Sequence, residues 1–320
     1  MIRKTDYCLV IGAGSIGERY IRNLWALGFT NIVVLRTRNL PFRDIGKAHV
    51  SVVTSWQEVE AIHPVVAFIC NPTSMHLSSA MECVDRGIHV LVEKPLSHTS
   101  AGLDELARVA FEKKVFVQIG YMMRYHPFMK KIKEWVALES LGKLLQIQSH
   151  WGEYLPDWHP WEDYRQSYAA RREMGGGVAL TLSHDLDLAN WIAGSTLIDY
   201  KRLYNFRSGL EVNVESGADF LLQYENGVTA NIHLNYFQKV KERWYRYIFE
   251  CAVVKIDFFR SEMVIQESAG EKLEQLENFD RNELFLEQIK HFIAALDHPE
   301  KSASNIAESK QIINLCAENE

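Results

Sequence analysis

The stretch YCLVIGAGSIG, residues 7–17, decides the fold. Its first five residues are mostly apolar and predict a buried strand, and residues 16–27 predict a helix directly after the glycines. In a G-x-G-x-x-G between strand and helix, the first glycine permits a tight turn, the second admits a pyrophosphate and the third allows close packing. The helix N-terminus also attracts negative charge. The stretch therefore predicts a dinucleotide site; the alternative is a glycine-rich turn without a ligand.

Outward from this turn, short apolar runs alternate with helical patterns to about residue 120, which is typical of β-α-β units. Further strands are predicted at residues 32–35, 65–70, 89–92 and 115–119, and further helices at 75–86 and 100–113. The strands lack strict alternation of apolar and polar residues, so helices should cover both faces of their parallel sheet.

Beyond about residue 125 the pattern changes to longer strands rich in aromatic and β-branched residues. Strands are predicted at residues 144–151, 217–224 and 228–236, with Asn226-Gly227 as a hairpin turn between the last two. Amphipathic segments 182–193 and 283–296 should cover one face of this antiparallel sheet. The sequence thus predicts an α/β dinucleotide-binding domain in residues 1–122 and an α+β domain in residues 123–320.

Composition excludes several classes of protein. A chain of 320 residues with 47% hydrophobic and 24% charged residues is typical of two globular domains, and a net charge of -6 gives no general attraction for nucleic acid. No apolar run approaches the roughly 20 residues of a membrane helix, and the first residues do not resemble a signal peptide. Five widely spaced cysteines indicate reduced thiols and no metal site, so a cytoplasmic location is expected.

The segment after the second strand bears on the choice of cofactor. An acidic residue at this place usually binds the ribose 2'-hydroxyl of NAD, but here the sequence is Arg36-Thr37-Arg38. A guanidinium can bind a 2'-phosphate through paired hydrogen bonds and can stack on adenine. The sequence therefore favours NADP, with NAD possible, unless the two arginines are ordinary solvated loop residues.

Two further loops follow strands of the predicted parallel sheet, at the edge where such folds bind ligands. The first carries Asn71-Pro72-Thr73 and His76, and the second carries Glu93-Lys94. Oxidation of an alcohol requires that its hydroxyl proton leave, and a desolvated lysine with a lowered pKa can accept that proton. Lys94 is therefore a candidate acid/base, although a lysine-proline after a strand is also common in exposed loops.

Taken together and in order, these motifs resemble the glucose-fructose oxidoreductase/inositol dehydrogenase/rhizopine catabolism family. The set comprises residues 12–17, 71–76, 93–95, 175–177 and 183–187, and spans nearly the whole chain. The resemblance implies an N-terminal Rossmann domain and a C-terminal α+β domain whose open sheet faces the substrate site and often supports oligomerisation, here a homodimer or homotetramer. It also implies that Lys94 is catalytic and that His184 is the histidine of the second-domain motif.

The predicted cofactor-binding residues are Gly12, Gly14, Ser15, Ile16, Gly17, Arg36, Thr37, Arg38, Asn71, Pro72, Thr73, His76, Glu93 and Lys94. One departure from the family's pattern concerns His184. Members usually carry an aspartate three or four residues before this histidine, where the chain has Leu180 and Thr181. A threonine hydroxyl can hydrogen-bond to substrate but cannot raise the imidazole pKa as a carboxylate would. We expect His184 to act on substrate with Thr181 beside it; the alternative is a histidine that caps or packs.

The remaining candidates for substrate binding are Arg124 and the aromatic stretch 151–165. Arg124 could contact an anionic group or form an interdomain salt bridge. Trp158, Tyr164 and Arg165 belong to a segment whose rings could stack on a sugar or base, with Arg165 or Arg171 pairing with a diphosphate. Loop packing or a subunit contact is the alternative. The stretch resembles that of family members from bacterial surface-polysaccharide or nonulosonic-acid biosynthesis, which points towards activated sugars.

The sequence therefore predicts an NAD(P)-dependent oxidoreductase that interconverts a hydroxyl and a ketone on a sugar or nucleotide-activated sugar. Two alternatives stay open. One is a non-catalytic protein that senses NAD(P), because the resembled family includes a transcriptional co-repressor. The other is a dehydrogenase of non-sugar carbonyls such as dihydrodiols.

Overall fold

The computed structural model describes residues 2–37, 41–46, 50–299 and 302–317. The chain forms two compact units, one made of Met1–Met122 together with Asn282–Glu320, and the other of Met123–Arg281. The first division falls at the predicted boundary. The prediction that the second domain extends to residue 320 was wrong, because the chain returns to the first unit at Asn282.

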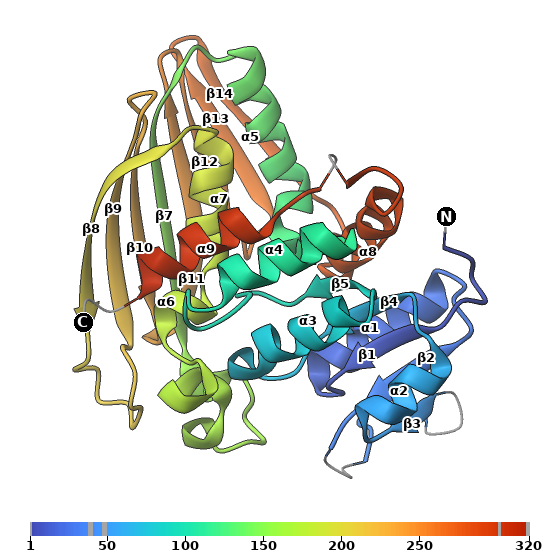
Figure 1. The fold of residues 1–320 in the computed structure, drawn as a ribbon. Helices are drawn as coiled ribbons and strands as arrows, with labels where there is room; N and C mark the ends of the chain where they lie inside the picture. Colours follow the sequence, from blue (N-terminus) through green and yellow to red (C-terminus); the bar gives the residue numbers. More distant parts are fainter. Residues whose placement is uncertain (1, 38–40, 47–49, 300–301, 318–320) are drawn as a thin grey trace. The chain divides into compact units, whose positions relative to one another are not determined.

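The first unit contains a six-stranded parallel sheet in the order β3-β2-β1-β4-β5-β6 (Figure 1). Its strands are β1 (Cys8–Ile11), β2 (Ile32–Leu35), β3 (Ser51–Val53), β4 (Val66–Ile69), β5 (His89–Val92) and β6 (Val117–Ile119). Its helices are α1 (Ser15–Ala26), α2 (Trp56–Ile62), α3 (His76–Asp85), α4 (Leu103–Lys113), α8 (Asn282–Ala295) and α9 (Ile306–Cys316), with a short 3-10 turn η2 (Thr73–Met75) before α3. Strands β1, β2 and β4 are buried throughout, as the apolar runs predicted.

The order of the strands places the candidate site. Strands run outward from β1 in one direction and from β4 in the other. Because crossovers between parallel strands are right-handed, α1 lies on the opposite face of the sheet from α3 and α4. The carboxyl ends of β1 and β4 are therefore the switch point at which open sheets of this kind bind ligands.

Helix α8 buries its apolar side in the first unit. Phe285 meets the ring of Tyr20 on α1 at 6.0 Å, and Phe292 lies 5.7 Å from both Phe68 and Phe116. The prediction that residues 283–296 cover the antiparallel sheet was therefore wrong. Amphipathic periodicity shows that a helix has an apolar face, but it does not say which sheet that face covers.

The second unit has an eight-stranded sheet in the order β14-β13-β12-β11-β7-β10-β9-β8, in which only the β7–β10 pair is parallel. The strands are β7 (Leu144–Tyr154), β8 (Leu197–Asn205), β9 (Gly217–Tyr224), β10 (Thr229–Asn235), β11 (Phe237–Phe249), β12 (Ala252–Asp257), β13 (Glu262–Glu267) and β14 (Gly270–Gln275). The hairpin predicted at Asn226-Gly227 is confirmed: it joins β9 to β10, and Gly227 has a φ of 87°.

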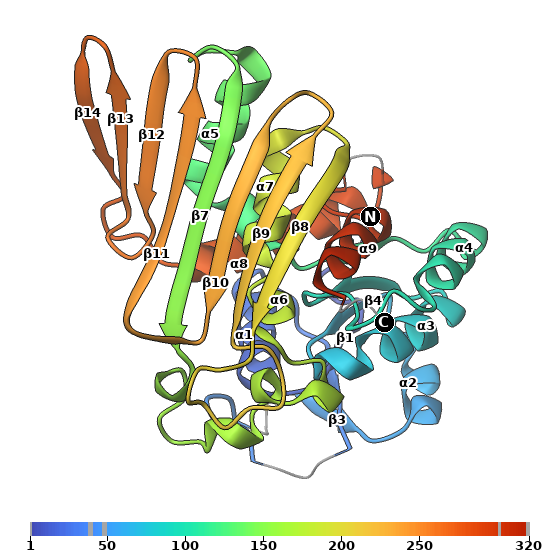
Figure 2. The ribbon, with the colours of Figure 1, turned by 90° about the vertical axis from the view of Figure 1, so that its left-hand side faces the viewer.

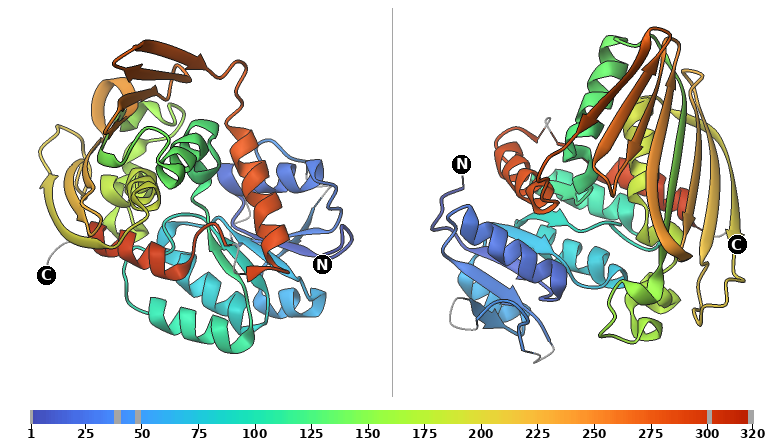
Figure 3. Two further views of the ribbon diagram at one scale, coloured as in Figure 1. Left: turned by 90° about the horizontal axis from the view of Figure 1, so that it is seen from above. Right: turned by 180° about the vertical axis from the view of Figure 1, so that it is seen from behind.

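Three helices of this unit lie on one face of its sheet, as Figures 2 and 3 show: α5 (Pro127–Leu138), α6 (Val178–Thr181) and α7 (His184–Ala193). Strand β9 explains the choice of face, because its residues alternate between buried Ala218, Phe220 and Leu222 and exposed positions between them. Short 3-10 turns complete the unit: η3 (Met122–Tyr125), η4 (Leu155–Asp157), η5 (Tyr164–Gln166), η6 (Tyr168–Ala170) and η7 (Arg172–Met174). Among the helices of the described ranges, none has the length and apolar character needed to cross a membrane.

Candidate functional site

The glycine turn between β1 and α1 has the geometry that its sequence predicts. Gly12 has a φ of +88°, and a Cβ built there would lie 2.7 Å from the backbone nitrogen of Asn71. A Cβ at Gly17 would lie 2.0 Å from the carbonyl oxygen of Gly12. Any side chain at either position would force the strand, the helix and the loop after β4 apart.

Gly14 differs from Gly12 and Gly17, the other two glycines of the motif, in a way that fits a ligand. A Cβ at Gly14 would meet no atom within 4 Å, so the space beside this residue is open. Gly14 is also the N-cap of α1, and no side chain of the described residues caps the helix there. The first backbone N–H groups of a helix have no acceptor within the helix and attract phosphate. Open space and uncapped N–H groups, at the turn formed by residues 12–17, fit the pyrophosphate of a dinucleotide.

A buried carboxylate, which the sequence analysis missed, organises the segment after β2. Glu18 is 1% exposed, and its two oxygens accept the backbone N–H groups of Arg43 and Asp44 at 2.8 and 2.7 Å. Arg36 lies in the same segment with its guanidinium 4.2 Å from the ring centre of Phe42. Thr37 is exposed, and Arg38 lies outside the described residues. The signal for Glu18 was an acidic residue in the first turn of α1.

The loop after β4 brings the predicted residues Asn71 and His76 together. The ring nitrogens of His76 lie 2.8 Å from the Asn71 carbonyl oxygen and 2.7 Å from the carbonyl oxygen of Pro95. The side-chain amide of Asn71 donates to Ser79 Oγ at 2.8 Å. Burial is the main cause that lowers the pKa of His76, and the two carbonyls act in the opposite direction. Pro72 and Thr73 complete the turn into α3, and Thr73 is buried.

Lys94 follows β5 and is half-buried, and the Lys94-Pro95 peptide bond is cis. Its neighbour Glu93 accepts a hydrogen bond from the hydroxyl of Tyr20 at 2.6 Å. The hydroxyl of Tyr20 in turn accepts a hydrogen bond from the side-chain amide of Gln288 at 2.7 Å. Hydrogen bonds and close approach thus join the loops after β1, β4 and β5, with the predicted cofactor residues that these three loops carry, into one edge of the first unit.

In the second unit, His184 is the first residue of α7 and Thr181 is the last residue of α6, and both are buried. Two buried ion pairs fix α7 just after His184. Asp185 accepts a hydrogen bond from Arg243 of β11 at 2.7 Å, and their side chains are 0% and 1% exposed. Asp187 accepts two hydrogen bonds from Arg124, at 3.0 and 2.6 Å.

Arg124 therefore belongs to an ion pair within the second unit, whereas the alternative considered from the sequence was a salt bridge between domains. Its guanidinium is 5% exposed and also lies 5.9 Å from the ring centre of Trp191. A bidentate pair with Asp187 accounts for its burial. A contact with substrate stays a prediction.

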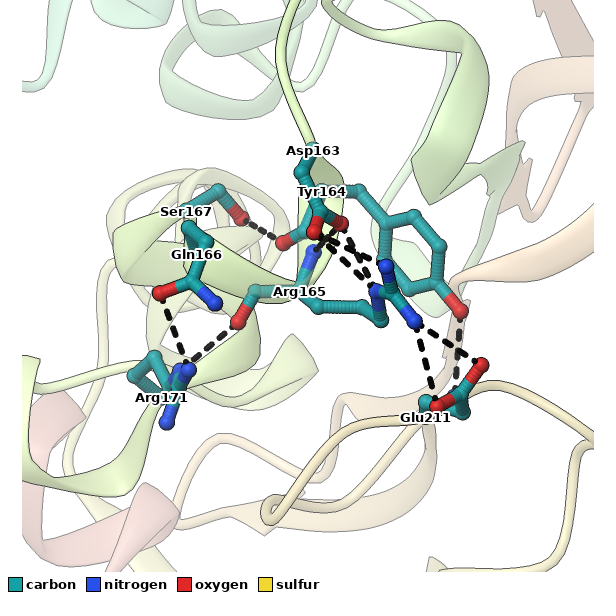
Figure 4. A network of polar contacts seen from close by, with 7 residues as sticks. All are labelled: Asp163, Tyr164, Arg165, Gln166, Ser167, Arg171 and Glu211. Atoms are coloured by element: carbon teal, nitrogen blue, oxygen red, sulfur yellow. Dashed lines mark hydrogen bonds and ion pairs between the residues drawn. The ribbon is translucent and has the colours of Figure 1, made fainter.

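Residues 151–154 of the aromatic stretch belong to β7, and the chain from there to residue 174 contains the short turns η4 to η7. Arg165 and Arg171 donate hydrogen bonds within residues 163–171, and Arg165 also donates to Glu211 (Figure 4). Arg165 donates to Asp163 at 2.9 Å and to Glu211 at 3.4 Å, while Arg171 donates to the carbonyl of Arg165 at 2.6 Å. The hydroxyl of Tyr164 accepts the backbone N–H of Glu211 at 3.1 Å. A diphosphate would have to compete with two carboxylates for Arg165, whose contact with substrate stays a prediction.

Trp158 packs edge-on against Tyr236 at 5.4 Å between ring centres. Trp161, by contrast, is 70% exposed and lies beside His159. Exposed rings of this kind are available for stacking, whereas Trp158 is partly committed to packing. Within the described ranges, no group of three His, Cys, Asp or Glu side chains is arranged to hold a metal ion.

Comparison with known families decides the wider assignment. Residues 7–121 match the model described as "Oxidoreductase family, NAD-binding Rossmann fold", and residues 129–252 match the model of the GFO/IDH/MocA C-terminal domain. The chain belongs to the GFO/IDH/MocA oxidoreductase family. Its Rossmann unit is NAD-binding by family, and the predicted combination of a Rossmann sheet with a mainly antiparallel sheet is confirmed.

Individual relatives are distant. The chain is 28% identical over 244 residues to the uncharacterized oxidoreductase YrbE of Bacillus subtilis, covering 70% of this chain and 65% of that protein. It is 27% identical over 183 residues to a D-xylose 1-dehydrogenase (NADP(+)) of Haloferax volcanii, covering 56% and 52%. The matches thus span less than two thirds of either relative.

Solved structures of the same fold cover nearly the whole chain. UDP-N-acetylglucosamine 3-dehydrogenase GnnA of Acidithiobacillus ferrooxidans superimposes with a TM-score of 0.76 at 18% identity, covering 98% of this chain and 96% of that one. Levoglucosan dehydrogenase in complex with NADH gives a TM-score of 0.83 at 13% identity, covering 97% and 95%. At these identities the likeness is one of fold.

Proposed function

We propose that this oxidoreductase transfers hydride between a nicotinamide cofactor and a hydroxyl or ketone of a sugar or nucleotide-activated sugar. The observation that carries the proposal is the edge of the first unit at which Lys94 lies on a loop joined to the glycine turn. Asn71 approaches Gly12 on one side of this edge and reaches Pro95 through His76 on the other. Relatives named as D-xylose 1-dehydrogenase and levoglucosan dehydrogenase support the sugar class.

In the proposed reaction, each residue has a distinct task. The turn at residues 12–17 holds the pyrophosphate on the N–H groups of α1, and bound nicotinamide supplies the acceptor or donor of hydride. Lys94 accepts the hydroxyl proton during oxidation and returns a proton during reduction. His184 and Thr181 orient the reacting hydroxyl. The buried ion pairs of Asp185 and Asp187 hold the helix that begins at His184.

Lys94→Ala tests the central assignment. We expect turnover to fall about 100-fold or more, since that is the usual size of a general acid/base contribution, while cofactor affinity changes little. Reduced-nicotinamide absorbance measured in both directions, with pooled sugars, pooled nucleotide sugars and their keto forms, gives the assay. Turnover that is unchanged in Lys94→Ala would refute the role of Lys94. Silence with every pool despite tight cofactor binding would instead favour a protein that senses the cofactor.

NADP is the proposed cofactor, with NAD as the alternative. Arg36 is the residue that supports it, because its guanidinium is held over Phe42 in the segment that Glu18 anchors. We expect Arg36→Asp to weaken NADPH binding much more than NADH binding in a fluorescence titration, since a carboxylate repels a 2'-phosphate. A variant that still prefers NADPH would show that Arg36 does not decide the choice.

We further propose a homodimer or homotetramer in the cytoplasm that binds neither nucleic acid nor membrane. The sheet face of the second unit that lies opposite α5, α6 and α7 can be followed in Figure 2. By strand register it carries Leu203 of β8 (74% exposed) and Leu221 of β9 (56% exposed). Exposed apolar positions of this kind are typical of interfaces between subunits. Light scattering of the wild type and of Leu203→Glu tests the assembly, and a monomeric wild type would refute it.

A further inference from the structure

The two residues that flank Lys94 are each held by a buried side chain from another element of the first unit. On one side, the Glu93 carboxylate is bound by Tyr20 of α1. On the other side, Nδ1 of His76 of α3 lies 2.7 Å from the carbonyl oxygen of Pro95. The backbone that carries Lys94 is thereby tied at both ends.

On the Glu93 side, the direction of each hydrogen bond is determined. The amide of Gln288 donates to the hydroxyl of Tyr20 at 2.7 Å, so the single hydroxyl proton is left to donate to Glu93 at 2.6 Å. Burial raises the pKa of Tyr20 well above its ordinary value, and the nearby charge of Glu93 acts in the same direction. The phenol therefore keeps the proton with which it holds the carboxylate.

This arrangement leaves little room for adjustment. Tyr20 is fully buried, with its ring centre 5.4 Å from that of Phe68 and its edge against Phe285. Gln288 is also fully buried, and it comes from helix α8. A Cβ built at Gly120, just after β6, would lie 3.1 Å from Glu93 Oε1, so only glycine leaves ordinary space for the carboxylate.

On the Pro95 side, His76 spans two loops. Its ring is 2% exposed and lies within 2.8 Å of carbonyl oxygens of both Asn71 and Pro95. A Cβ built at Gly12 would lie 2.7 Å from the backbone nitrogen of Asn71, so the two loops are in close approach. His76 thus relates the position of the Lys94 loop to the position of the glycine turn.

We propose that Tyr20, Gln288 and His76 are positioning residues for Lys94, and that α8 thereby becomes part of the reacting unit. This inference rests on the proposed function of Lys94. The amine of a lysine is joined to its backbone by four flexible methylenes, so the position of the amine depends on how firmly the backbone is held. Displacement of a reacting group by about 1 Å can cost about 100-fold in rate.

Tyr20→Phe tests the proposal with little change in volume. The lysine amines are dimethylated with 13C-formaldehyde and observed by NMR, and the Lys94 signal is assigned by its absence in Lys94→Arg. We expect Tyr20→Phe to shift the Lys94 signal but not that of Lys310, whose amine pairs with Asp104 at 2.6 Å. The matched control is Tyr224→Phe, which removes an equally buried hydroxyl, bonded at 2.7 Å to Asn190 in the second unit. This control should leave the Lys94 signal in place.

Kinetics then separate positioning from general loss of structure. We expect Tyr20→Phe to lower kcat about 10-fold or more while the Kd for NADPH stays within about 2-fold. If Tyr20 acts through Glu93, Tyr20→Phe should lower kcat much less in the Glu93→Ala variant than in the wild-type protein. Gln288→Met, which removes the donor to Tyr20, gives a second variant should Tyr20→Phe fail to fold.

A Lys94 signal that stays in place in every folded variant of Tyr20 and Gln288 would overturn the proposal. Equal losses of kcat in Tyr20→Phe and Tyr224→Phe would overturn it as well. The NMR result does not depend on turnover. A shifted Lys94 signal in a protein that turns over no tested substrate would therefore support the positioning and refute the proposed reaction.

Discussion

Replacing Arg243 with methionine should destabilise the second unit strongly, because it leaves a charge in the core. Arg243 is 1% exposed, donates to Asp185 at 2.7 Å and lies 3.6 Å from the ring centre of Trp151. Asp185 is 0% exposed and also accepts a hydrogen bond from Tyr245 at 3.1 Å. Breaking a buried pair by removal of one partner costs about 3–5 kcal/mol. At about 2–4 °C per kcal/mol for a unit of this size, the melting temperature should fall by about 6–20 °C.

The pH dependence of this loss identifies its cause. Burial raises the pKa of Asp185 above its ordinary value, and the charge of Arg243 opposes that rise. Without Arg243 the folded-state pKa should rise further, while the unfolded-state pKa stays near 3.8. Between these two values the folded state binds more protons, so its stability falls as pH rises. The deficit of Arg243→Met should therefore be smaller at acid pH than at neutral pH.

Thermal unfolding followed by circular dichroism at several pH values is the assay. Asp185→Asn in the Arg243→Met background removes the unpaired charge and should recover a large part of the stability. Arg260→Met is the control, since Arg260 forms an exposed pair with Asp257 and should cost about 0–1 kcal/mol. A deficit that is independent of pH, together with no recovery in the double variant, would show that packing and not charge explains the loss.

Three other predictions concern particular side chains. Gly14→Val should weaken NADPH binding at least about 10-fold, because its side chain enters open space. Its melting temperature should fall less than that of Gly17→Val, because a Cβ at Gly14 meets no atom within 4 Å whereas a Cβ at Gly17 would meet Gly12. Burial, with a smaller effect from Arg243, lowers the pKa of His126 to about 4. As pH drops from about 6.5 to about 4, the unfolded state takes up the proton first, so the free energy of unfolding should fall by about 3 kcal/mol. His126→Asn, which keeps a capping acceptor for α5, should flatten that decline in melting curves recorded at several pH values. Glu18→Gln should weaken NADPH binding more than NADH binding, because Glu18 anchors the segment of Arg36 through Arg43 and Asp44, and an equal change in both affinities would contradict this.

The local pattern of the first unit could be predicted because it depends on near neighbours in the sequence. Strand β2 lies where its apolar run placed it, and the turn at Gly12 follows from conformations that only glycine adopts readily. Strand β3 was missed, since it has three residues and two of them are exposed. Helix α2 was also missed, although Ser55 and Glu58 form a capping box that the sequence displays.

Partners that are distant in the sequence could not be predicted in the same way. The prediction placed Glu93 near the cofactor, but nothing in its surroundings indicated that Tyr20 and Gln288 hold it. These partners come from helices at opposite ends of the chain, and periodicity does not say which helix faces meet. Similarly, the sequence indicated that Arg124 could pair with an anion but did not identify that anion. Its anion, Asp187, is 63 positions away on α7.

Helix α7 shows why its two aspartates matter to the residue that precedes them. Asp185 and Asp187 are two positions apart, so on a helix they point to different sides and cannot share one partner. Asp185 fixes the helix to β11 through Arg243, and Asp187 fixes it to the segment before α5 through Arg124. Two fixed directions determine both the position and the rotation of a helix. The position of His184, one residue before Asp185, is fixed together with that of the helix.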